Sequence, residues 1–174
     1  MRVVPGLFVL LLLAGCAEEK EPATCDQNCK DFNGALSVID TVNFLYNQNF
    51  AGQPVGAKDI TVNCSASGST HITGTTAADN GTGINTLHLD FDMAACRRVG
   101  SNYDLTMTGL VANDGTFSSD STSMTYAGSA IVLLGEVGGG VEDLDETCDF
   151  AISRTTTSVT GTFCTRTFQG QLAQ

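Results

Sequence analysis

The stretch KDFNGALSVIDTVNFLYNQN, residues 30–49, is the one part of the chain with the period of an amphipathic helix. Steps of three and four place its apolar residues on one face, which comprises Phe32, Ala35, Leu36, Ile39, Val42 and Tyr46. Because Asn33-Gly34 is an unfavourable start, we expect the helix to begin nearer Ala35. An apolar stripe of this kind usually packs against a sheet rather than binding a ligand, so the stretch predicts a helix buried on a β-sheet.

The chain after Lys58 changes to Thr, Ser, Gly and β-branched residues with turn dipeptides at regular intervals, which is typical of an antiparallel meander. The expected strands cover residues 59–64, 69–77, 83–93, 103–113, 117–128, 130–137, 147–154 and 158–168. The fifth and sixth are one strand if the chain bends at Gly128. The predicted fold class is mainly β: an antiparallel meander of about seven or eight strands, forming a curved sheet or a barrel, with one N-terminal amphipathic helix packed on it.

Two dipeptides, Asn80-Gly81 and Asp114-Gly115, have the chemistry of two-residue hairpin turns. Each turn sets a register in which apolar residues meet on one face. The expected pairs are Ile72 with Leu89, Gly74 with Leu87, Leu105 with Met124, and Tyr103 with Tyr126.

The alternation along residues 103–108 indicates which face of the sheet is solvated. Tyr103, Leu105 and Met107 alternate with Asp104, Thr106 and Thr108, so we expect one packed face and one wet face. The apolar run Ala130–Leu134 is interpreted as a buried strand.

The N-terminus has the layout of a secretory signal over residues 1–15, with Arg2, an apolar run at residues 7–13 and then small residues. Leu13-Ala14-Gly15-Cys16 resembles the bacterial lipobox. That resemblance implies cleavage before Cys16 and its acylation with chains such as palmitate, which would hold the protein on a membrane. Ala17, rather than Asp, after the cysteine implies the outer membrane, with the domain facing the periplasm or the cell surface. Residues 16–24 are expected to be a lipidated, disordered tether.

Residues 25–174 are then expected to form a single disulfide-bonded β domain. Loss of residues 1–15 removes Arg2 and no acidic residue, so the net charge goes from −11 to −12. Such an acidic chain repels nucleic acid, which we exclude as a partner.

Six cysteines remain besides Cys16, and an even number in an exported protein predicts three disulfides, for which 15 connectivities exist. If the fifth and sixth predicted strands are one strand, four of these cysteines fall toward one rim of the sheet, which favours Cys64–Cys96 and Cys148–Cys164 and leaves Cys25–Cys29. Neither long-range pair fits its hairpin register: the first requires a bulge or a flexible strand end, and apolar matching of Ile152 with Val159 puts the second out by one residue. The spacing does not fit a zinc site.

Candidates for chemistry are few. His71 and His88 are the histidines of the chain, and the predicted register places His71 opposite Asp90 and His88 opposite Thr73 on the wet face. A hydrolase using them lacks a recognisable nucleophile motif. Clustered carboxylates on a loop could hold Ca²⁺, but their spacing is not that of a known calcium loop; the cluster comprises Glu142, Asp143, Asp145 and Glu146.

The whole pattern resembles uncharacterised Thr/Gly-rich β-sheet lipoproteins of Gram-negative bacteria. The features that carry this resemblance are Leu13–Cys16, the single helix, and the closing segment CDFAISRTTTSVTGTFC at residues 148–164. The sequence predicts a non-enzymatic envelope lipoprotein with a structural or protein-interaction role and no cofactor. The alternative is a binding module that carries a lipid or other apolar ligand between helix and curved sheet, and a hydrolase is the third hypothesis.

Overall fold

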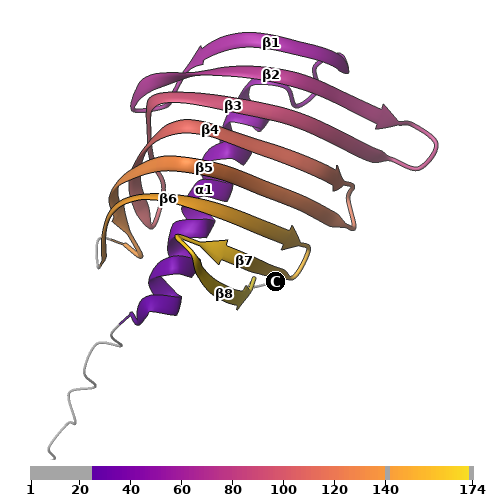
Figure 1. Ribbon diagram of the computed structural model, residues 1–174. Coiled ribbons are helices and arrows are strands. Elements are labelled where there is room, and N and C mark those ends of the chain that lie inside the picture. Colours follow the sequence, from indigo (N-terminus) through magenta and orange to yellow (C-terminus); the bar gives the residue numbers. More distant parts are fainter. Residues whose placement is uncertain (1–24, 140–141, 173–174) are drawn as a thin grey trace, which may run out of the picture.

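The computed structural model describes residues 25–139 and 142–172, which form one helix and one eight-stranded antiparallel sheet (Figure 1). The strands lie side by side in sequence order, and the sheet is open, with β1 at one edge and β8 at the other. Its elements are α1 (Gln27–Asn49), β1 (Gly56–Asn63), β2 (Ser67–Asp79), β3 (Ile84–Val99), β4 (Tyr103–Phe117), β5 (Thr122–Val137), β6 (Glu142–Thr155), β7 (Ser158–Phe163) and β8 (Arg166–Gln171).

The predicted fold class is confirmed, and of its two forms the curved sheet is the one observed. The long strands curve around α1, which crosses them on the concave side (Figure 1). The expected signal peptide at residues 1–15 and the lipidated tether at residues 16–24, including Cys16, lie outside the described residues. Within the described residues, none of the helices has the length and apolar content needed to cross a membrane.

Helix α1 begins at Gln27, so the prediction of an onset near Ala35 was wrong. Asp26 caps the helix by accepting a hydrogen bond from the Cys29 backbone N–H at 2.9 Å. Gly34 is retained inside the helix because a Cβ there would lie 2.8 Å from the Phe163 ring of β7. The expected apolar face packs on the sheet: its central members Ala35, Ile39 and Val42 are buried, whereas Phe32, Leu36 and Tyr46 at its margins are partly buried.

A line of β-bulges runs from the first residues of β2 through the interior of β3, β4 and β5 and bends the long strands. The pairing shifts at neighbouring places in four successive strands, and Ala95 in β3 and Ala130 in β5 have positive φ there (48° and 52°). Bulges increase local twist and bend a strand, so this line curves the open sheet around the helix. Strand β5 continues through its bulge, which confirms that the predicted fifth and sixth strands are one strand bent after Gly128.

Both predicted turns were wrong in detail. Asn80-Gly81 lies in a four-residue connection between Asp79 and Ile84, which moves the register so that Ile72 pairs with Phe91. Asp114-Gly115 lies inside β4, and the chain reverses instead at residues 118–121. Gly115 has a φ of 140°, and a Cβ there would lie 2.1 Å from the Ser123 carbonyl oxygen. The glycine therefore serves close strand approach rather than a turn.

Other strand pairings also differ from the predicted ones. The last predicted strand is two strands, β7 and β8, which reverse direction at Cys164-Thr165, and Ile152 pairs with Gly161 rather than Val159. The residues that were expected to pair across the two turns have other partners in the sheet. The observed pairs are Gly74 with Leu89, Leu105 with Gly135, Met124 with Gly115, Tyr103 with Val137, and Tyr126 with Asn113.

The division into a packed and a wet face was correct. In β4, Leu105 and Met107 are fully buried, while Thr108 is exposed. The run Ala130–Leu134 also alternates: Ile131 and Leu133 are buried, but Leu134 is 44% exposed, so the run is not buried throughout as predicted. The register errors of two residues at Ile72 and ten residues at Met124 are even, so both side chains stayed on their expected face. The pairing of Leu105 is displaced by eleven residues, because the bulge between Thr108 and Val111 adds one residue to the offset.

The three predicted disulfides are present: Cys25–Cys29, Cys64–Cys96 and Cys148–Cys164, with Cα–Cα distances of 5.3, 5.4 and 4.7 Å. The bulge that Cys64–Cys96 was expected to require lies between Met93 and Cys96. Cys64–Cys96 joins the β1–β2 connection to β3, and Cys148–Cys164 joins the β7–β8 turn to β6. A disulfide typically contributes about 2–4 kcal/mol to stability.

Asp149 supports the bulge in β5, which gives a pH-dependent prediction. Its carboxylate accepts hydrogen bonds from the Ala130 N–H at 2.8 Å and the Ser129 hydroxyl at 2.9 Å, and these lower the pKa of Asp149 below its ordinary value. A lowered folded-state pKa means stabilisation that is present above the unfolded carboxyl pKa of about 3.9 and lost as the pH falls through the folded value. We expect Asp149→Asn to lower the melting temperature at pH 7, with the difference from wild type shrinking on acidification.

The matched control is Asp120→Asn in the β4–β5 turn, which should leave the melting temperature unchanged. Thermal unfolding between pH 2 and pH 7 is the measurement. An undiminished difference at pH 2, or no difference at pH 7, would contradict the assigned role of the carboxylate.

Candidate functional site

Both histidines lie on the convex, solvated face, as expected, but with other partners than predicted. His71 Nε2 lies 2.8 Å from Asp59 Oδ1, and His88 Nδ1 lies 2.7 Å from Asp114 Oδ1. In the sheet, Asp90 stands opposite Thr73, so the predicted His71–Asp90 pairing was wrong by two residues, and His88 stands opposite Thr75. The His71 and His88 side chains are 47% and 64% exposed. These are exposed cross-strand hydrogen-bonded pairs on an open surface.

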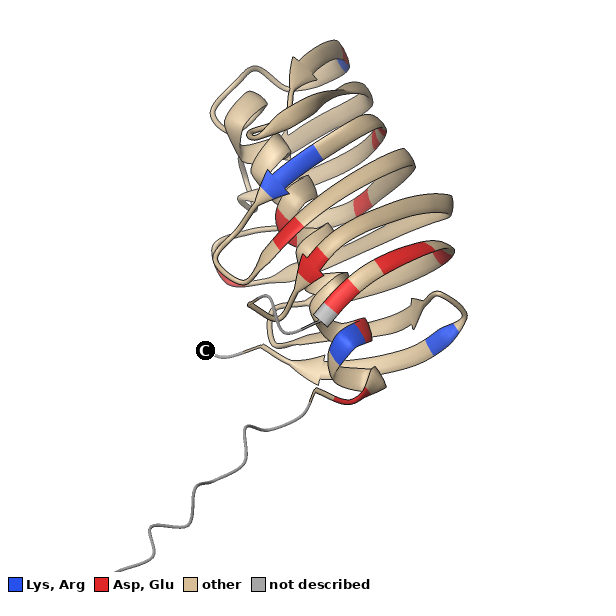
Figure 2. Cartoon of the chain, turned by 90° about the vertical axis from the view of Figure 1, so that its left-hand side faces the viewer, with Lys and Arg blue, Asp and Glu red and all other residues tan. Residues whose placement is uncertain are grey.

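The acidic segment proposed for calcium is not a loop. Its residues lie in β6, where alternation separates exposed Asp143 and Asp145 from half-buried Glu146. Asp143 stands opposite Glu136, which in turn stands opposite Asp104, so acidic residues of neighbouring strands gather on one side of the molecule (Figure 2). The candidate Ca²⁺ ligands whose side chains the structure describes, Asp143, Asp145 and Glu146, therefore do not all lie on one face of β6.

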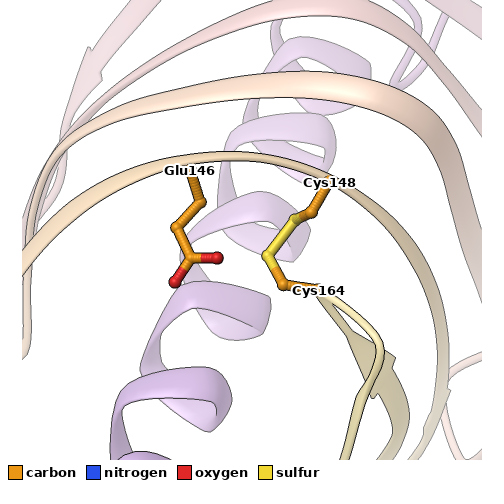
Figure 3. Close-up of side chains that lie close together, drawn as sticks. All are labelled: Glu146, Cys148 and Cys164. Atoms are coloured by element: carbon orange, nitrogen blue, oxygen red, sulfur yellow. A yellow bond between two sulfur atoms is a disulfide. The ribbon is translucent and has the colours of Figure 1, made fainter.

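Glu146 lies beside Cys148 and Cys164, a grouping with the residue types of a metal site (Figure 3). The two sulfur atoms are bonded to each other, so neither is a thiolate ligand. The Glu146 carboxylate accepts a hydrogen bond from Arg166 Nη2 at 3.1 Å. The arrangement is an ion-paired carboxylate next to a disulfide rather than a metal centre.

Arg166 also holds the buried carboxylate of Asp31 on α1. Its Nε and Nη2 atoms donate to Asp31 at 2.9 Å each, and Gln27 donates a further hydrogen bond at 2.9 Å. These bonds to Asp31 raise the pKa of Arg166. Asp31 is only 2% exposed, so this bidentate pair connects the first turns of the helix to the start of β8.

A second polar group joins the middle of α1 to β3 and β4. The Tyr103 hydroxyl donates to Asp40 Oδ2 at 2.5 Å, and Arg98 Nη2 donates to the same oxygen at 3.0 Å. Burial, with a further contribution from the hydrogen bond to Asp40, raises the pKa of Tyr103 to about 12. The Arg98 guanidinium also lies over the Phe44 ring at 3.8 Å. Since each of these polar groups has its partner, this network positions the helix.

The opposite flank of α1 holds a pocket of about 230 Å³, which we call the helix–sheet pocket. Its apolar wall contains the Tyr46 and Phe117 rings, packed edge to face with centroids 5.7 Å apart. Its full lining is Asn43, Tyr46, Asn47, Leu87, Phe117, Thr122, Met124, Tyr126 and Arg154.

The polar end of the helix–sheet pocket contains one buried donor that lacks a partner. Arg154 is the charged member of the lining, and its Nε atom is buried with no hydrogen-bond partner among the described residues. Tyr126 donates its hydroxyl hydrogen to Asn43 Oδ1 at 3.0 Å. Burial raises the pKa of Tyr126, and the nearby Arg154 guanidinium opposes that rise. A half-buried cation, a phenol and an amide thus converge beside an apolar wall, which is the composition of a ligand site.

Sequence patterns alone did not reveal this pocket. One signal was available: Phe150, Ile152 and Arg154 occupy alternate positions of β6, so the arginine shares the buried phase of its strand. An arginine at an apolar strand position indicates a buried partner or a ligand.

Comparison with models of known protein families, with curated proteins and with solved structures finds no match to this chain. The site is therefore interpreted from its own geometry.

The Arg166–Asp31 pair yields a stability prediction. Arg166→Met leaves the Asp31 carboxylate buried without its cation, and we expect a loss of about 2–3 kcal/mol in unfolding free energy. This is below the roughly 3–5 kcal/mol of a fully buried pair, because the Arg166 side chain is 36% exposed. Denaturant unfolding at pH 7 measures the loss.

Two further variants test the cause. Asp31→Asn combined with Arg166→Met should recover part of the loss, since no unpaired charge remains. Arg97→Met removes a surface partner of Asp104 and should cost less than about 1 kcal/mol. Equal costs at Arg97 and Arg166 would show that burial of Asp31 does not matter.

Proposed function

We propose that this protein is an envelope lipoprotein whose folded domain binds a small ligand in the helix–sheet pocket. The observation that carries the proposal is the Arg154 guanidinium, which faces this pocket with a buried, unpartnered Nε. An unsatisfied buried donor is costly, by roughly 1–3 kcal/mol. Such a cost is tolerated where a ligand supplies the missing acceptor.

Packing elsewhere under the helix supports the location. Val38, Val42 and Leu45 on α1 are at most 1% exposed, and they face a concave surface that is largely buried. A ligand held between helix and sheet along the whole interface would have to displace these side chains. The pocket at the flank of α1 offers room without such displacement.

The anchor part of the proposal rests on sequence. Leu13–Cys16 resembles a lipobox and Ala17 follows the acylated position, which favours the outer membrane. The residues from Cys16 to Thr24 would then separate the membrane surface from α1. The membrane is therefore one proposed partner, through acylated Cys16.

A structural or protein-interaction role is the second candidate. Leu110 and Leu134 on the convex face are 51% and 44% exposed, and large exposed apolar side chains favour contact with another protein. A hydrolase has less support, because both histidines lie on the convex face and away from the helix–sheet pocket.

The anchor makes one prediction. Cys16→Ser removes the acylated thiol, so the protein should leave the membrane fraction and appear in the periplasmic fraction. Fractionation followed by immunoblotting measures this, with Cys25→Ser, which leaves Cys16 intact, as the control that stays with the membrane. Retention of the Cys16→Ser protein as an integral part of the outer membrane would contradict the anchor.

The pocket makes another prediction. Asn47 is exposed at the pocket mouth, so Asn47→Trp should cover the opening without disturbing the core. Native mass spectrometry of the membrane-extracted protein should show a small-molecule adduct in wild type that is absent from this variant. Gln48→Trp, one residue further along the same exposed stretch of helix, is the matched control and should keep the adduct. Self-association with no adduct in wild type would favour the protein-interaction role instead.

A further inference from the structure

Among the described residues, the arginines differ in whether they pair with a carboxylate. Arg97, Arg98 and Arg166 each pair with an aspartate carboxylate at 2.5–3.0 Å. Arg154 forms no ion pair with any described residue, although the whole chain contains 19 acidic residues and 8 basic ones. In so acidic a protein, an unpaired arginine on the concave side, away from the acidic convex face, is a site that attracts anions.

The environment of Arg154 has donors and little competing negative charge. Its neighbours in the pocket lining, Asn43, Asn47 and Thr122, are uncharged polar residues. The buried Asn113 side chain lies opposite Tyr126 in the sheet and donates to the Thr125 carbonyl at 3.2 Å. Arginine presents a planar set of donors that suits a carboxylate held by two hydrogen bonds. The chemistry of this end therefore favours an oxyanion.

The rest of the pocket is apolar. Leu87, Phe117 and Met124 line it together with the Tyr46 ring, so the part of a ligand beyond its anionic group meets carbon. The volume of about 230 Å³ corresponds to about eight water molecules at roughly 30 Å³ each. That is small for a ligand site, and it suits an acid with a short chain or the first part of a longer chain.

We propose that the helix–sheet pocket binds an amphiphilic carboxylate, with its carboxylate on the Arg154 guanidinium and its hydrocarbon part against Tyr46, Phe117 and Met124. This proposal rests on the proposed ligand-binding function and specifies its ligand class. The carboxylate completes the hydrogen bonding of Arg154, and the apolar chain excludes water from the ion pair, which strengthens it. A membrane-derived fatty acid and a small free acid share this chemistry.

Binding is tested with three probes on the acylated full chain in lipid nanodiscs, with empty nanodiscs subtracted. Titration calorimetry is the primary measurement. Tyrosine fluorescence is a second readout, because the chain has no tryptophan and two of its three tyrosines line the pocket. Octanoate should bind, whereas 1-octanol, which lacks the charge, and acetate, which lacks the chain, should bind at least tenfold more weakly. Equal binding of octanoate and 1-octanol would overturn the proposal.

Three variants distinguish the effect of Arg154 on binding from the effect of the overall charge of the protein. Arg154→Met should weaken octanoate binding about 10- to 100-fold, the usual effect of a hydrogen bond to a charged group. Arg97→Met, which removes the same charge from the convex face, should leave the dissociation constant unchanged. Arg154→Lys keeps the charge and should retain part of the affinity. Unchanged octanoate binding by the Arg154→Met protein would refute the assignment.

The thermal stability of Arg154→Met gives an independent readout. A protein loses stability when an arginine that has a structural partner is replaced. It does not lose stability when the replaced arginine has a partner only in the ligand-bound state. We expect an unchanged or higher melting temperature without octanoate, and the loss of the upward shift that octanoate produces in wild type. A lower melting temperature without ligand would assign Arg154 a structural role.

The two proposals can fail separately. If the adduct is lost in Asn47→Trp but kept in Arg154→Met, the pocket binds a ligand of another class. If hexadecanoate binds more tightly than octanoate, the source is a membrane fatty acid, and if octanoate binds more tightly, it is a small free acid. Either order of affinity supports a carboxylate ligand, and the proposal is overturned if neither acid binds.

Discussion

The line of bulges across β2, β3, β4 and β5 determines how the sheet can pack around the helix. A flat sheet would touch a crossing helix along a narrow strip, whereas a sheet bent at one level on each strand wraps around it. The positive φ of Ala95 and Ala130 costs on the order of 1–3 kcal/mol at each residue. Local hydrogen bonds offset this cost: Thr108 accepts from the Ala95 N–H, and Asp149 accepts from Ala130.

Bending also determines where space remains. Along one inward row of the sheet, Leu87, Gly115, Met124 and Arg154 are successive partners on β3 to β6. Gly115 contributes no side chain to that row, because its backbone approaches β5 too closely to accommodate a Cβ. The row lies beside the last turns of α1, and the helix–sheet pocket opens there. The same glycine that permits close strand contact thus leaves the concave surface hollow between two apolar side chains.

Electrostatics distinguish the two flanks of α1. On one, Asp40, Arg98 and Tyr103 satisfy one another and fix the helix; at its N-terminal end, Asp31 and Arg166 do the same. On the other flank, Arg154 faces the pocket without a carboxylate. Charges that are paired within the chain stabilise its fold, whereas an unpaired charge in a pocket is available to a ligand, and the proposals above follow from that difference.

The order of helix and meander, the inward or outward face of most strand residues, and the three disulfide pairs could be predicted from the sequence alone. The faces could be predicted because strand alternation has a period of two, so register errors of two residues at Ile72 and ten residues at Met124 left both side chains facing inward. Tertiary structure decided the positions of the turns, since Asp114-Gly115 suits a tight turn and a kinked strand equally well. It also decided the site. Whether Arg154 is paired depends on which carboxylates the curvature brings near it, and that is a property of the folded sheet.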